Sequence, residues 1–133
     1  MTMPMTRTLR TILLADAATG AAAAVLTIGA SGLLAELLAL PAGLIFWAGV
    51  ALLPIVAFLV VMARRPVVPR GWIAEIALIN AAWVVASFAL LASGWVQPNM
   101  LGVAFVVAQA LAVRLFAVLQ AGQLRAATAA AAG

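Results

Sequence analysis

The 133-residue sequence contains no cysteine, histidine, tyrosine or lysine. Without cysteine there is no disulfide and no thiolate chemistry, and without histidine the commonest general base and metal ligand is missing. Because neither histidine nor lysine is present to activate a serine or threonine hydroxyl, no nucleophile and base pair can be assembled. Glycine-rich phosphate loops and metal-ligand spacings are absent as well. We therefore expect no enzyme, no metal and no cofactor.

Charged residues are also scarce. They make up 8% of the chain and hydrophobic residues 68%, whereas soluble domains carry roughly 25% charged residues. This composition indicates an integral membrane protein whose main partner is the lipid bilayer. The net charge of +4 comes from seven arginines, and the longest basic run is only Arg64-Arg65. We therefore expect no nucleic-acid partner.

The apolar sequence is long enough for four membrane crossings, since a spanning helix needs about 20 largely apolar residues. The first apolar stretch contains Asp16 and Glu36, which are placed near opposite interfaces if the span lies between them. A turn signal at Pro41 separates the first span from the second, and another around Pro98 separates the third from the fourth. The prediction is one transmembrane domain over residues 1–133, with spans at about 17–38, 44–62, 72–92 and 100–120.

The arginines outside the spans fall on one side of this topology. Two precede the first span, three lie in the central loop at residues 64–70, and one lies in the C-terminal tail, while neither of the other turns has any. The positive-inside rule therefore places both termini and the central loop in the cytoplasm. The exclusive use of arginine with abundant alanine is typical of a GC-rich bacterial genome, which indicates a bacterial inner membrane.

The fold class expected from these observations is an all-α membrane protein, a four-transmembrane-helix bundle built from two helical hairpins, N-in/C-in. The hairpins run in the same direction, and each has an acid near the cytoplasmic end of its first helix, Asp16 and Glu75. Duplication of one hairpin and chance similarity of apolar sequence both explain this likeness.

Three charged residues are the first candidates for a site, because charge within a membrane span is costly and tends to be paired or functional. Arg114 lies six residues inside the predicted cytoplasmic end of the fourth span, roughly 9 Å at the rise of an α-helix. Its side chain either reaches the lipid headgroups or forms an ion pair with Glu75 or Asp16. Such a pair most simply acts as a structural clamp.

Uncharged polar residues complete the candidate cluster. Asn80 and Ser87 are seven residues apart on the third span, so they share one helix face, and Gln109 and Gln120 share a face of the fourth. Amides in a membrane interior usually bond across helices, and we expect Gln109 to bond Asn80 or a backbone carbonyl. The candidate intramembrane polar cluster is Asp16, Glu75, Asn80, Gln109 and Arg114.

Two functions fit this sequence. The first, which the sequence favours, is a membrane component without catalytic machinery, with a structural, accessory or assembly role in a larger membrane complex. The second is a small transporter that works as a homo-oligomer, since four helices rarely enclose a path alone. In length, helix count and an acid in the first helix, Asp16, the chain resembles the small multidrug resistance exporters. It departs from that family in the predicted interfacial position of Asp16 and in having Arg114 within a span.

Overall fold

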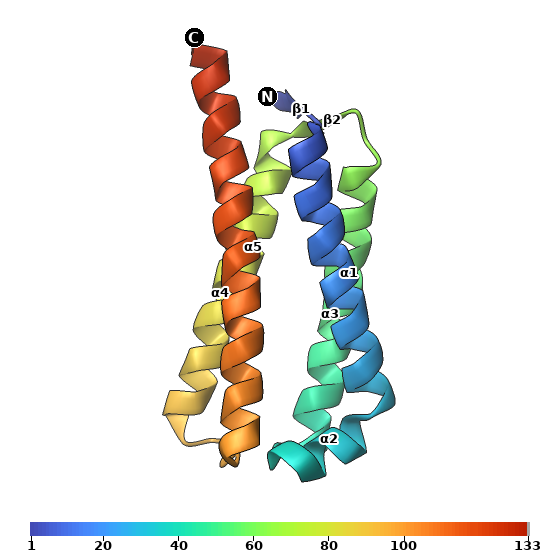
Figure 1. Cartoon of the computed structure of the whole chain (residues 1–133), viewed down its shortest axis with the longest axis vertical. Helices are drawn as coiled ribbons and strands as arrows, with labels where there is room; N and C mark the ends of the chain where they lie inside the picture. The colour runs from blue at the N-terminus through green and yellow to red at the C-terminus, as the bar shows by residue number, and fades with distance from the viewer. Residues whose placement is uncertain (133) are drawn as a thin grey trace.

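The computed structural model describes residues 1–132, and in this part of the chain the structure is almost entirely helical (Figure 1). Four of its helices, α1, α3, α4 and α5, are long and apolar enough to cross a membrane. The prediction of an all-helical fold with four helices able to span a membrane is thus confirmed. The elements are β1 (Thr2–Pro4), α1 (Arg7–Gly29), α2 (Ser31–Leu38), α3 (Ala42–Ala63), β2 (Val67–Pro69), α4 (Arg70–Ser93) and α5 (Met100–Ala132).

The first helix differs from the predicted span at both ends. It begins at Arg7 because the Thr6 hydroxyl accepts a hydrogen bond from the backbone N–H of Leu9 at 3.1 Å, which is an N-cap. It ends at Gly29, and residues Ser31–Leu38, which were predicted to belong to the same span, form the short helix α2. Asp16 consequently lies in the middle of α1 rather than at its interfacial end.

The last helix also extends beyond the predicted span and continues to Ala132. An isolated alanine-rich tail of this length would fray in water. Here contacts with the rest of the bundle stabilise the tail. Leu124 and Ala127 pack against a core cluster, and Nη2 of Arg70 donates a hydrogen bond to the Ala127 carbonyl at 3.2 Å. Tertiary contact, and not alanine propensity alone, accounts for the longer helix.

The helices pack chiefly in two antiparallel pairs. α1 lies along α3, and α4 lies along α5 (Figure 1). Contact between the pairs is made mainly by α5 with α1 and α2, whereas α3 and α4 contact each other only sparsely. Both ends of the chain lie at one end of the bundle, which we call the terminal end; α2 and the α4–α5 turn lie at the other, the turn end.

A small antiparallel sheet closes the terminal end. β1 pairs with β2 and places Met3 opposite Val68. Both side chains are buried, and they join a core cluster with Leu13, Met62 and Ile73. The sequence analysis did not predict this sheet, because each strand has only three residues and alternation over so short a length is uninformative.

A separate, smaller core lies at the turn end and contains Leu38, Ile45 and Val106. At this end α5 approaches α2 so closely that a Cβ on Gly102 would meet the backbone carbonyl of Leu38. The side chain of Asn99 donates to the Leu37 carbonyl at 2.8 Å. The two helix pairs are thus joined at both ends, and the region between these contacts contains the candidate site.

Candidate functional site

A hydrogen-bonded group of three side chains joins the two helix pairs inside the bundle. Asp16 of α1 accepts hydrogen bonds at Oδ2 from Nδ2 of Asn80 at 2.9 Å and from Nε2 of Gln120 at 2.7 Å. Nδ2 of Asn80 also donates to Oε1 of Gln120 at 3.0 Å. We call Asp16, Asn80 and Gln120 the polar clasp, because it connects α1, α4 and α5.

The polar clasp is buried. The exposed fraction of the side chains is 8% for Asp16, 6% for Asn80 and 0% for Gln120. Polar groups within a membrane bundle are costly unless they find partners. The contacts of the clasp therefore allow a carboxyl group to sit mid-helix in α1, and they fix how the two helix pairs meet.

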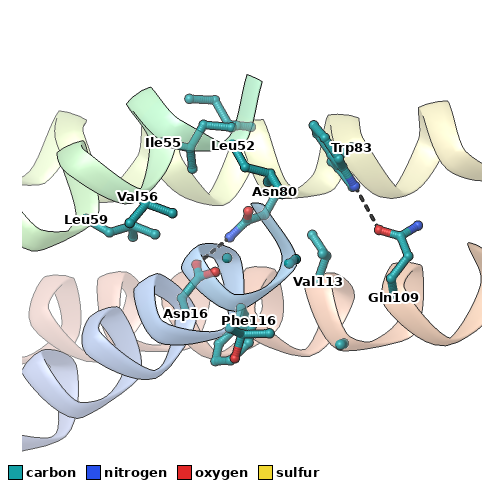
Figure 2. Close-up of a pocket in the computed structure, with 15 residues that line it drawn as sticks. Asp16, Leu52, Ile55, Val56, Leu59, Asn80, Trp83, Gln109, Val113 and Phe116 are labelled. Carbon is teal, nitrogen blue, oxygen red and sulfur yellow. Dashed lines mark hydrogen bonds between the residues drawn. The ribbon is translucent and has the colours of Figure 1, made fainter. Parts of the chain in front are cut away.

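Two oxygen atoms of the clasp accept no hydrogen bond from the described residues. Within residues 1–132, no side-chain or backbone donor bonds Oδ1 of Asp16 or Oδ1 of Asn80. In the same part of the chain, Nε of Arg70 is the only fully buried side-chain nitrogen or oxygen without a partner. Both Oδ1 atoms therefore retain accessible surface. Asp16 and Asn80 both line a cavity between the helices (Figure 2).

The cavity has two adjoining parts. The part at the polar clasp has a volume of about 130 Å³ and is lined by α1, α3, α4 and α5. The other, of about 430 Å³, reaches toward the turn end, where Leu44 and Trp47 line it. Both parts share Ala23, Trp83 and Gln109. Small-molecule sites are typically mostly apolar, with a few placed polar groups and a volume of roughly 300–1,000 Å³, and this cavity has that character.

A second polar group links α4 with α5 beside the cavity. Nε1 of Trp83 donates to Oε1 of Gln109 at 2.9 Å, and Nε2 of Gln109 donates to the Ser87 hydroxyl at 2.9 Å and to the Val106 carbonyl at 2.8 Å. The Ser87 hydroxyl in turn donates to the Trp83 carbonyl. Gln109 therefore bonds a backbone carbonyl, one of its two expected partners, and these contacts fix the Trp83 ring at the cavity wall.

The structure does not bring Glu75 or Arg114 to the polar clasp. Both side chains are exposed, and within residues 1–132 neither forms an ion pair with the other or with Asp16. The reason is helical geometry at 100° per residue. Arg114 precedes Gln120 by six residues and points about 120° away from it, and Glu75 precedes Asn80 by five and points about 140° away. Within the described residues Arg114 therefore forms no ion pair with an acid, and its side chain is exposed.

Gln120 is the member of the polar clasp that the predicted cluster left out. It lies eleven residues after Gln109, close to the same helix azimuth, but it was assigned to the end of its span. The spacing of Gln109 and Gln120 already predicts that they share a helix face. Ending the predicted span at residue 120, however, placed Gln120 at an interface and not inside the bundle.

The site offers hydrogen-bond acceptors, one carboxyl group and an apolar wall. Within residues 1–132 it includes no group of three or more histidine, cysteine or acidic side chains that would hold a metal ion. Acceptors beside an apolar wall can bind a small molecule that has both polar and apolar parts. Comparisons with family models, with curated proteins and with solved structures find no match to this chain.

Proposed function

We propose that this chain is a non-catalytic membrane protein that binds a small molecule between its two helix pairs and acts as a small transporter. One observation carries the proposal: Asp16, Asn80 and Gln109, from three different helices, line one cavity within the bundle. Polar groups in membrane interiors tend to line a path or pair with one another. Here they do both, since Asp16 lines the cavity while its Oδ2 accepts two hydrogen bonds.

A structural or accessory component of a larger membrane complex is the second candidate. The polar clasp favours it, because such a contact gives a scaffold a fixed shape. A scaffold has no need, however, for a cavity of which one part is lined by acceptors without partners and the adjoining part has a volume of about 430 Å³. The carrier function accounts for both features, whereas the scaffold accounts only for the clasp.

The proposal includes a location in a bacterial inner membrane, as two hairpins with both termini in the cytoplasm. The arginines at the terminal end support this orientation. Nε of Arg10 donates to the Ala63 carbonyl at 2.8 Å, and Arg65 lies over the Trp72 ring with its guanidinium carbon 4.9 Å from the ring centroid. The packing of α1 along α3 and of α4 along α5 supports the hairpin arrangement.

The chain works in this proposal as a homo-oligomer. Four helices seldom enclose a complete path, and α3 and α4 are only sparsely in contact. A neighbouring copy would close the path on the side that these two helices leave open.

Cysteine reactivity tests whether the cavity is accessible. The chain has no cysteine of its own, so single variants of the full chain, purified in detergent, report on single positions. Three alanines of α5 form a matched set: Ala112 lines the cavity, Ala110 is fully buried, and Ala108 is exposed on the outer surface. A thiol reacts as its thiolate, which forms where water is present.

We expect the Ala112→Cys variant to react with a small water-soluble maleimide faster than the Ala110→Cys and Ala108→Cys variants. Packing shields the second position and lipid or detergent covers the third. If the Ala112→Cys variant reacts no faster than the other two, the cavity is closed and the scaffold function is favoured instead.

A further inference from the structure

We propose that the terminal end of the bundle binds the phosphate group of an anionic phospholipid between Arg10, Arg64 and Arg65, which we call the basic group. The inference is independent of the carrier function, because it concerns the outer surface of the bundle and not its cavity. It follows from the placement of the three guanidinium groups, from their charge, and from the apolar side chains beside them.

The fold brings the three arginines together from two segments of the chain. Nε of Arg10, on α1, donates a hydrogen bond to the Ala63 carbonyl at 2.8 Å. Ala63 is the last residue of α3, and Arg64 and Arg65 follow it directly. The last carbonyls of a helix have no partner within the helix and interact favourably with cations, which explains the position of Arg10. One guanidinium group is thus fixed beside the backbone that carries the other two.

An aromatic contact orients Arg65. Its guanidinium carbon lies 4.9 Å from the centroid of the Trp72 ring, near the start of α4, which is a cation–π contact. The Trp72 ring is itself packed against Phe58, with the ring centroids 5.6 Å apart. Arg65 is therefore held in place without an acidic partner.

The hydrogen-bonding capacity of the basic group is almost unused. A guanidinium group has five N–H donors. Within residues 1–132, the bond from Arg10 to Ala63 is the only hydrogen bond that the three side chains donate, and all three residues are exposed. Because the planar fork of arginine matches the oxygens of a phosphate, the basic group can bind an anion that has several acceptor oxygens.

The charge of the basic group favours a lipid with a net negative charge. The chain has only three acidic residues: Asp16 is buried in the polar clasp, Glu36 lies on α2 at the turn end, and Glu75 lies on α4. Within residues 1–132 none of them forms an ion pair. A zwitterionic headgroup has a cation of its own, which the arginines would repel, whereas anionic headgroups attract basic residues at a membrane surface.

Exposed apolar side chains lie about one helical turn deeper in the bundle than the basic group. Leu14 follows Arg10 by four residues on α1, and Val61 precedes Arg64 by three at the end of α3. Their exposed fractions are 43% and 51%. A free phosphate would gain nothing from these side chains, whereas the acyl chains of a lipid would pack against them. The ligand is therefore a phospholipid.

Lipid titration tests the ligand class. Phosphatidylglycerol or phosphatidylcholine with the same acyl chains is added to the full chain in a mild detergent. Bound lipid is counted by native mass spectrometry, and the rise in unfolding temperature is followed. We expect phosphatidylglycerol to bind about tenfold or more tightly, since each basic residue at a membrane surface contributes about fivefold.

Two results would overturn the ligand class. Equal affinity for the two lipids would show that the negative charge of the lipid is not recognised. Displacement of phosphatidylglycerol by inorganic phosphate at the same concentration would show that the ligand is a free anion and not a lipid. We expect inorganic phosphate to leave the bound lipid in place.

Two variants separate a site from general surface charge. Arg64→Gln and Arg125→Gln each remove one exposed arginine whose side chain makes no hydrogen bond within residues 1–132, and Arg125 lies on α5, outside the basic group. We expect Arg64→Gln to weaken the binding of phosphatidylglycerol about fivefold and Arg125→Gln to weaken it clearly less. Equal weakening would overturn the site, because any positive charge at this end would then suffice. If Arg64→Gln fails to fold, Arg65→Gln provides the same comparison.

Discussion

Replacement of Gln120 by methionine tests the polar clasp. The substitution is close to isosteric and removes both hydrogen bonds that Gln120 makes, one to Oδ2 of Asp16 and one from Nδ2 of Asn80. Hydrogen bonds between membrane helices contribute on average about 0.6 kcal/mol and at most about 1.7 kcal/mol each. Since two are lost at a fully buried position, we expect the free energy of unfolding to fall by about 1–3 kcal/mol.

The same substitution at Gln123 is the matched control. Gln123 lies on the same helix, and its side chain makes no hydrogen bond within residues 1–132. Both variants are unfolded by titration with a denaturing detergent from a mild one, with helix content followed by circular dichroism. If Gln120→Met and Gln123→Met lower the free energy of unfolding equally, the clasp does not hold the two helix pairs together.

A double-mutant cycle separates the clasp from simple packing. Asn80→Leu removes the same donor to Gln120 from the other side. If the two residues act as one network, the double variant should be less destabilised than the sum of the single variants. Strict additivity would contradict a shared network.

Three further changes follow from the fold. Gly102→Ala should destabilise the chain by about 1–3 kcal/mol, because its Cβ meets backbone at the α2–α5 contact; Gly122→Ala, which meets nothing within 4 Å, should be tolerated in the same detergent titration. Arg114→Leu should change the free energy of unfolding by less than about 0.5 kcal/mol, as is usual for exposed positions; loss of folded protein would instead indicate an ion-pair clamp. In intact cells, a membrane-impermeant maleimide should label Ser93→Cys and not Thr128→Cys, and the reverse labelling would contradict cytoplasmic termini.

Much of the fold could be predicted because the bilayer imposes strong constraints. Four apolar stretches of sufficient length imply four helices whatever their partners are. Boundaries were less predictable, because they depend on local contacts. The Thr6 cap begins α1 early, and the contact between Arg70 and Ala127 holds a tail that would otherwise fray.

The candidate site was only partly predictable, for a different reason. Sequence reasoning selected Asp16 and Asn80 from their cost in a membrane, and these residues do meet. It also considered an ion pair of Arg114 with Glu75 or Asp16, because opposite charges attract, beside the alternative that Arg114 reaches the headgroups. The third member is instead Gln120, which lies 104 residues from Asp16 in the chain. Which polar side chains meet depends on the direction that each one takes around its helix axis. That direction can be derived only once the helix ends and the packing of the helices are known.

The most direct test of the central claim, that the cavity between the helix pairs is a ligand site, is protection of one cavity position. The Ala112→Cys variant is treated with maleimide with and without cyclohexylmethanol, a compact apolar alcohol. The account predicts that the alcohol slows the reaction several-fold, because a ligand in the cavity covers the wall at Ala112. A reaction rate that the alcohol does not change would contradict it.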